Sequence, residues 1–210
     1  MEVKEQAESE SAASAAFTDF EKLKEFLGQD VVQLWSDASD FFLAANPSKP
    51  HVSHERRQRL GRAAVLTAAA AFEAVTNFLS EQILRAGPAG GYTLTEYQID
   101  CLREKRKYLD GGMVKEKNQI YSSKERFLLL FRLVTGLPDR HKTLFQDLDR
   151  SFELRDRLVH PKPGPSVGIL TDQMWTSAFL GFLTADLVLA RMWVVRRKEG
   201  SVKHRAFGGN

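Results

Sequence analysis

Apolar residues recur at steps of three and four positions through most of this chain, which is the spacing of one face of an α-helix. The first such segment covers residues 17–45, at Phe20, Leu23, Phe26, Leu27, Val31, Leu34 and Trp35. It predicts one helix, or two helices with a break near Gly28. The acidic, Ser/Ala-rich residues 1–16 lack the pattern, and we expect them to be disordered.

Polar caps and Gly/Pro breaks divide the rest of the chain into further helices. Ser53 can cap the first of them, and Gly87-Pro88 can end it. Residues 93–96 and 122–125 each have the form of a capping box, so each predicts a helix start. The predicted helices cover approximately residues 53–85, 93–109, 122–134, 139–159 and 171–197.

None of these segments shows a convincing alternation of apolar and polar residues, which is the pattern of a half-buried strand. The sequence therefore predicts an all-α fold with two long apolar helices and shorter helices around them. With 210 residues in the whole chain, we expect one helical domain over residues 17–199. The Gly-rich, basic residues 200–210 are expected to form a flexible tail.

The composition is that of a protein with its own core, because 43% of the residues are hydrophobic and 27% are charged. Residues 63–79 and 173–195 are apolar enough to suggest membrane spans, but the second contains Asp186 and Arg191. Ionisable groups are costly in lipid, so we expect both helices to be buried in a core or a dimer interface. Cys101 is the only cysteine, which excludes an internal disulfide and fits a cytoplasmic protein.

The charge of the chain permits a nucleic-acid partner without requiring one, since the net charge is +3 and the pI is near 9.0. Basic residues gather in residues 56–62 and again in residues 103–117. The predicted contacts to an RNA backbone are Arg103, Lys105, Arg106 and Lys107. Tyr108 beside them could stack on a base. The alternative is that each basic stretch is simply a solvated helix face.

The strongest candidate for chemistry is the segment Phe152–Pro161 at the end of a predicted helix. It contains Arg155, Asp156 and His160. A His moves protons near neutral pH, an Arg binds an anionic phosphate, and an Asp can hold the imidazole. Asp156 and His160 share a helix face, and Pro161 disfavours helical backbone at His160, which frees the ring to reorient. These groups together can act on a phosphodiester without a metal.

Each residue of this motif also has a structural interpretation. His160 could be placed at a helix C-terminus because the helix dipole favours it there. Arg155 could form a surface ion pair with Asp156 or another nearby acid. Arg157 lies closer to His160 along the chain and competes with Arg155 for the role of phosphate ligand.

A second group of candidates lies in the long Ala-rich helix predicted over residues 53–85. Glu73 and Asn77, four positions apart, share one face of this otherwise apolar helix. A buried carboxylate needs a partner, and Arg155 or Arg157 could provide it. We prefer the interpretation that Glu73 forms a structural ion pair that supports the motif, over a direct catalytic role for Glu73.

This arrangement resembles the HEPN superfamily (higher eukaryotes and prokaryotes nucleotide-binding domains). Its members are small helical bundles in which a His follows an Arg after a spacer of about four to six residues, with a polar residue often next to the Arg. Arg155-Asp156 followed by His160 fits that pattern, and an apolar helix follows it, as in the family. The segment Ala71–Ala74 is similar to the family's earlier helix, so the resemblance covers about residues 55–197.

Many HEPN proteins are metal-independent ribonucleases, often toxins or phage-defence effectors, and others are binding or scaffold domains without activity. The resemblance therefore implies an endoribonuclease with no metal and no cofactor, which cleaves RNA as a homodimer. A dimer would supply two His160 rings, one as base and one as acid. An antitoxin or another regulatory protein could be a further partner. The alternative is a non-catalytic module that binds a nucleotide or protein, or that only dimerises.

Overall fold

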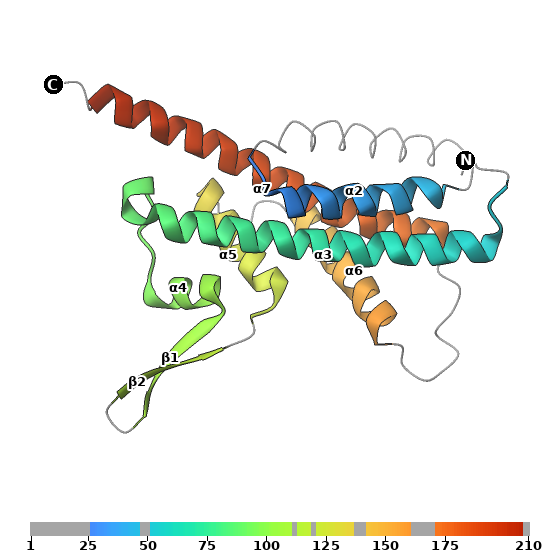
Figure 1. Ribbon diagram of the computed structural model, residues 1–210, viewed down its shortest axis with the longest axis horizontal. Helices are drawn as coiled ribbons and strands as arrows, with labels where there is room; N and C mark the ends of the chain where they lie inside the picture. Colours follow the sequence, from blue (N-terminus) through green and yellow to red (C-terminus); the bar gives the residue numbers. More distant parts are fainter. Residues whose placement is uncertain are drawn as a thin grey trace. The chain divides into compact units, whose positions relative to one another are not determined.

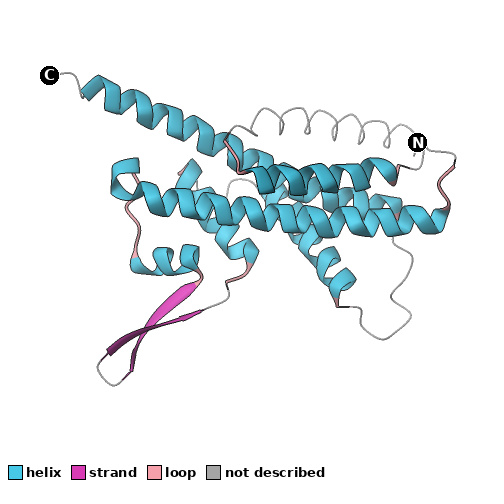
Figure 2. Cartoon of the chain, in the orientation of Figure 1, coloured by secondary structure: helices cyan, strands magenta, loops and turns pink. Residues whose placement is uncertain are grey.

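The computed structural model of the protein describes residues 26–46, 51–110, 113–118, 121–136, 142–160 and 171–207. Helices dominate these residues, and the strands among them form a single short hairpin (Figure 1, Figure 2). The predominantly helical class predicted from the sequence is therefore confirmed, with the hairpin as an unexpected addition. The tail expected at residues 1–16 lies outside the described residues.

The described helices are α2 (Gln29–Ala44), α3 (His54–Ala86), the 3-10 helix η1 (Gly87–Gly90), α4 (Glu96–Arg103), α5 (Ser123–Thr135), α6 (Lys142–Val159) and α7 (Asp172–Phe207). The hairpin consists of β1 (Lys105–Asp110) and β2 (Met113–Asn118), which pair antiparallel. The two long apolar helices of the prediction correspond to α3 and α7. The last helix continues past its predicted end near residue 197, so the expected tail is helical up to Phe207.

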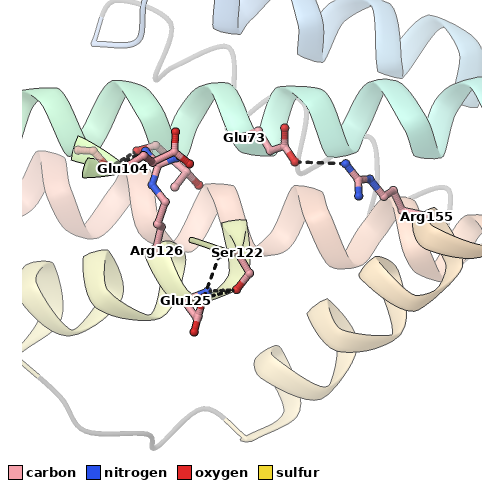
Figure 3. Close-up of polar contacts among 8 residues, drawn as sticks. Glu73, Glu104, Ser122, Glu125, Arg126 and Arg155 are labelled. Carbon is pink, nitrogen blue, oxygen red and sulfur yellow. Dashed lines mark hydrogen bonds and ion pairs between the residues drawn. The ribbon is translucent and has the colours of Figure 1, made fainter. Parts of the chain in front are cut away.

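Side-chain caps begin two of the helices. The Ser122 hydroxyl accepts a hydrogen bond from the Glu125 N–H at 3.2 Å, and the Glu125 carboxylate accepts one from the Ser122 N–H at 2.9 Å (Figure 3). This is the predicted capping box of α5, and its hydrogen bonds to the charged carboxylate lower the pKa of Glu125. The capping box of α4 is formed by Thr95 and Gln98, and so begins two residues later than the predicted box at residues 93–96.

The helix predicted over residues 93–109 is wrong in its second half, where the chain forms β1. The helix ends at Arg103 because Glu104 adopts the left-handed conformation, with φ of 54°. A left-handed residue stops the helical hydrogen-bond ladder. The dipeptide Gly111-Gly112 then separates two strand segments, and such a glycine pair favours a tight hairpin connection.

The described elements belong to two compact units, which we treat one at a time. The first unit consists of Met1–Ala74 and Asp139–Val188, and the second consists of Val75–Pro138 and Leu189–Asn210. Each of the long helices α3 and α7 therefore contributes its first part to one unit and its last part to the other. The single domain expected over residues 17–199 stays a prediction.

The core of the first unit is built from aromatic rings of α2, α3, α6 and α7. The Phe42 ring stacks on the Phe179 ring with centroids 4.2 Å apart. Phe72, Phe152 and Phe182 form a second cluster with centroid distances between 5.1 and 5.5 Å. Offset and edge-on ring contacts of this kind stabilise a core beyond the burial of area alone.

Helices α6 and α7 approach each other closely at Gly181. A Cβ atom at this position would lie 3.0 Å from the carbonyl oxygen of Asp147 and would collide with the Ser151 hydroxyl. Ser151 is fully buried and donates its hydroxyl proton to the same Asp147 carbonyl at 2.7 Å. The absence of a side chain at Gly181 therefore sets the position of α6, which is the helix that carries the predicted motif.

A buried carboxyl group joins α2 to α7 within the first unit. The indole N–H of Trp35 donates to Oδ2 of Asp186 at 2.9 Å, and Asp186 is fully buried. The other oxygen, Oδ1, has no hydrogen-bond partner within the described part of the chain. Burial raises the pKa of Asp186 well above its usual value, and the hydrogen bond from Trp35 opposes this only in part.

The second unit contains two arginines with structural partners. Arg126 is buried on α5, lies 3.0 Å from the Glu104 carboxylate, and is 3.4 Å from the hydroxyl of Ser80 (Figure 3). Arg196 on α7 donates to the carbonyl oxygen of Leu133 at 2.5 Å, near the C-terminus of α5. These arginines fix both ends of α5 within this unit.

Two helical segments, His54–Gly90 and Asp172–Arg197, are long and apolar enough to cross a membrane by length and composition. In the structure, the most apolar 18-residue stretch is 56% buried in the first segment and 67% buried in the second. Core helices of soluble proteins give the same result, so these segments are weak evidence for a membrane. The expectation that the protein has no membrane partner stays a prediction.

Candidate functional site

The predicted motif lies at the C-terminal end of α6. The backbone carbonyl of Asp156 accepts a hydrogen bond from the His160 N–H at 2.8 Å, which is the last bond of this helix. His160 is therefore at a helix end, as predicted. The helix packs inward through Leu148, Ser151 and Leu154, which are all buried, so residues of the opposite face reach the surface.

Arg155 is the best-positioned residue of the motif, because carboxylates from two helices hold its guanidinium. Its Nη2 lies 3.5 Å from Oε1 of Glu73 on α3, and its Nη1 donates to Oδ1 of Asp156 at 2.9 Å (Figure 3 shows the contact with Glu73). Of the two partners considered for Glu73, the structure thus joins it to Arg155. Glu73 is not buried as expected, since 41% of its side chain is exposed.

The expected contact between the Asp156 carboxylate and the His160 ring is not formed. The carboxylate accepts from Arg155, and a charged guanidinium is the stronger hydrogen-bond donor. His160 is exposed, and no hydrogen bond to its ring is formed within the described part of the chain. A role of Asp156 in orienting the imidazole stays a prediction.

Two carboxylates surround the Arg155 guanidinium, those of Glu73 and Asp156, so a phosphate would compete with both of them for this side chain. The side chains of Arg155 and Asp156 are 32% and 60% exposed, and ion pairs this close to solvent contribute only about 0–1 kcal/mol. A phosphate could displace such a pair, and the two observed contacts leave three of the five guanidinium N–H groups for it.

Two other candidates lie near this cluster along the chain but make no contact with it. Arg157 is exposed on α6, and Asn77 is exposed one helical turn after Glu73 on α3. Neither side chain forms a hydrogen bond or an ion pair within the described residues. The structure therefore brings together Arg155, Asp156 and Glu73, and it leaves Arg157 and Asn77 in solvent.

The four residues predicted to contact an RNA backbone do not share a helix face. Arg103 is the last residue of α4, whereas Lys105, Arg106 and Lys107 begin strand β1. Consecutive residues of a strand lie on opposite faces, so the strand separates Arg106 from its two neighbours. The predicted helical placement is confirmed for Arg103 and is wrong for Lys105, Arg106 and Lys107, because α4 ends at Arg103.

The other basic stretch forms one wall of a shallow groove at the start of α3. The groove is lined by Ser53, Glu55, Arg56, Arg59, Leu60 and Ala63. Arg59 is ion-paired with Glu55, and both side chains are highly exposed, so this groove is a weak anion site. Within the described part of the chain, no group of three or more His, Cys, Asp or Glu residues could hold a metal ion. The expectation of a metal-free site stays a prediction.

No protein-family profile matches this chain, and no curated protein or solved structure matches it. Any functional assignment therefore depends on the arrangement of the chain's own residues.

Proposed function

We propose that this protein is a metal-independent endoribonuclease of the HEPN type, with Arg155 and His160 as its catalytic residues. The observation that carries the proposal is the end of α6, where a guanidinium held from two sides lies five positions before an exposed imidazole. The proposal includes a homodimeric, cytoplasmic protein with a HEPN-like bundle. A toxin or phage-defence role, with an antitoxin or other regulatory partner, fits this activity.

The nucleophile in the proposed reaction is the 2′-hydroxyl of the RNA itself. A neutral His160 ring takes the 2′-OH proton while the oxygen forms a bond to phosphorus, and the bond from phosphorus to the 5′-oxygen breaks. A protonated His160 ring gives its proton to the leaving 5′-oxygen. The N–H groups of Arg155 bind the phosphate oxygens, whose negative charge increases in the transition state. The products are a 2′,3′-cyclic phosphate and a 5′-hydroxyl.

This mechanism calls for two copies of the chain. In-line displacement places the base and the acid on opposite sides of the phosphorus atom, and each motif contains one histidine. Two motifs related by a two-fold axis supply both rings and two guanidinium groups. Two large apolar residues of the same unit support such an interface, since Val159 beside the motif is 45% exposed and Met174 is 39% exposed.

The test is RNA cleavage by the purified full-length chain in the presence of EDTA, with chemical analysis of the new ends. We expect cleavage without added metal and 5′-hydroxyl ends that a polynucleotide kinase can phosphorylate directly. His160→Ala and Arg155→Ala should each lower the rate by roughly 100- to 1,000-fold, which is typical of lost proton transfer or lost oxyanion stabilisation. Arg150→Ala is the matched control, because Arg150 is an exposed arginine on the same helix.

Circular dichroism decides whether each variant is folded. If the folded variants cleave like the wild type, the catalytic role fails. If EDTA abolishes cleavage and magnesium or manganese restores it, the metal-independent mechanism fails. Asp156→Asn should reduce the rate less than the other two substitutions, because it keeps a polar group beside Arg155.

A non-catalytic binding or dimerisation module is the second candidate, and one observation favours it. Asp156 bonds to Arg155 and not to His160, so the three charged residues Glu73, Arg155 and Asp156 form an ion-pair group that needs no substrate. Under this alternative, the wild type cleaves no RNA, and Arg155→Ala changes the stability by no more than about 1 kcal/mol because the ion pairs are solvent-exposed. Under the nuclease proposal, the wild type cleaves RNA and the folded Arg155→Ala variant does not.

A further inference from the structure

The part of α3 that belongs to the first unit has one exposed face. A helix turns by about 100° per residue, so the number of a residue gives its position around the axis. The structure describes all of residues 55–73, and the exposed ones among them fall within one arc of about 120°. We name them the α3 face, which consists of Glu55, Arg56, Arg59, Arg62, Leu66 and Ala70.

The α3 face leads along the helix to the proposed catalytic motif. Glu73 lies within the same arc, about five turns after Glu55. Its carboxylate lies 3.5 Å from Nη2 of Arg155, which belongs to the same unit (Figure 3). Arg62 precedes Glu73 by about 16 Å along the axis, and Arg56 precedes it by about 26 Å. A strand bound at Arg155 can therefore continue along α3 towards the start of the helix.

The α3 face carries positive charge that no acid of the same arc offsets. Glu55 is ion-paired with Arg59, and Glu73 is ion-paired with the motif, so both acids of the arc already have an arginine partner. The side chains of Arg56 and Arg62 are exposed and form no hydrogen bond or ion pair with the residues that the structure describes. Two guanidinium groups are thus available to an anion.

The surface between these arginines and the motif contains no charge that would repel a phosphate. Residues 63–72 of α3 have no charged side chain, and Leu66 among them is 38% exposed. At the start of α3, Arg56 and Arg59 line the shallow groove described above, together with apolar Leu60 and Ala63. The groove alone is a weak anion site. Contacts along one strand act together, because binding at one site raises the effective concentration at the next.

We infer that the α3 face binds the RNA strand on one side of the cleaved phosphate, with Arg62 and Arg56 each on a backbone phosphate. The cations supply the attraction to the backbone. A stacked strand advances about 3.4 Å per phosphate, so Arg62 and Arg56 lie about five and eight nucleotides from the phosphate at Arg155. The inference rests on the proposed function for the choice of RNA, and it defines the substrate as a strand several nucleotides long.

The first experiment measures binding of a fluorescein-labelled 16-nucleotide single-stranded RNA by fluorescence anisotropy. The full-length chain carries His160→Ala so that the RNA stays intact. Arg56→Gln with Arg62→Gln removes two charges from the α3 face. We expect this pair to weaken binding by about tenfold and to reduce the slope of log affinity against log salt by about 1.4, or roughly 0.7 per lost phosphate contact.

The matched control is Arg85→Gln with Arg150→Gln, which removes the same charge from two exposed arginines outside the α3 face. This pair should change the affinity by less than about threefold. All four positions are exposed, and glutamine is as good a helix former as arginine, so each variant should stay folded. Circular dichroism checks this.

The second experiment uses the length of the substrate, with His160 present. Arg56→Gln with Arg62→Gln should raise KM for the 16-nucleotide RNA and leave kcat unchanged, since binding is lost equally from substrate and transition state. A dinucleotide contains a single phosphate, which is the one that is cleaved. It cannot reach the α3 face from Arg155, so the variant and the wild type should cleave it equally.

Several outcomes would overturn the inference. These are equal losses in the two arginine pairs, no loss in either pair, no binding of RNA by the wild type, or slower cleavage of the dinucleotide by the Arg56→Gln, Arg62→Gln variant. If this variant binds RNA normally but has a different mass in light scattering, the α3 face is a contact between protein copies and the inference also fails.

The inference and the proposed function can fail separately. If the wild type cleaves RNA and the α3 face proves irrelevant to binding, only the inference fails. If RNA binds to the α3 face and the wild type cleaves no RNA, only the proposed catalytic role fails.

Discussion

Replacement of Asp186 by asparagine tests the burial of a carboxyl group in the first unit. The asparagine side chain would keep an oxygen that can accept the hydrogen bond from Trp35, and it removes the ionisable group. It also places an amide N–H₂ where Oδ1 has no partner within the described residues, at a pH-independent cost of about 1–3 kcal/mol. The pH dependence of the stability difference is therefore more informative than its sign.

The direction of that dependence follows from the raised pKa. Above about pH 3.9 the unfolded chain loses the Asp186 proton, while the folded protein retains it because burial raises the pKa. Unfolding then releases a proton, so rising pH favours the unfolded state. The contribution of Asp186 to stability is complete below the unfolded pKa and is lost as the pH approaches the folded pKa. Each pH unit in this window lowers wild-type stability by about 1.4 kcal/mol relative to the asparagine variant.

The assay is urea unfolding followed by circular dichroism at pH 4.5, 5.5 and 6.5. We expect the free energy of unfolding of Asp186→Asn, relative to wild type, to rise with pH and then to level off. Asp186→Leu should give the same slope with a constant offset of about 1–3 kcal/mol, because the Trp35 N–H loses its acceptor. Asp40→Asn, an exposed change on α2, is the control. A difference that is the same at all three pH values would refute the argument.

Two further predictions concern packing and assembly. Gly181→Ala should lower the free energy of unfolding by about 1–3 kcal/mol, because the new methyl group collides with Ser151. Urea titration measures this difference. Unchanged stability would mean that α6 and α7 are not this close. Light scattering at micromolar concentration should give about twice the chain mass of 23.7 kDa. Val159→Glu should shift the measured mass towards that of the monomer, because it places a charge in the exposed apolar surface. A wild-type monomer would count strongly against the dimer.

The helices were predictable from the sequence because their signals are local. The three- and four-residue spacing of apolar positions and the Ser122 capping box depend on residues within one or two turns of each other, and both are found where they were expected. The hairpin was missed although a local signal for it exists. The dipeptide Gly111-Gly112, which follows the predicted helix 93–109, can end a helix, but it is also typical of a tight turn between two strands.

The contacts of the candidate site were less predictable, because they depend on which residues compete for one partner. The sequence placed Asp156 one turn before His160, but it could not show that Arg155 would take the Asp156 carboxylate. The expected burial of Glu73 was also wrong. Glu73 lies on an apolar helix, yet its side chain is partly exposed. Such differences arise from the packing of segments far apart in the sequence.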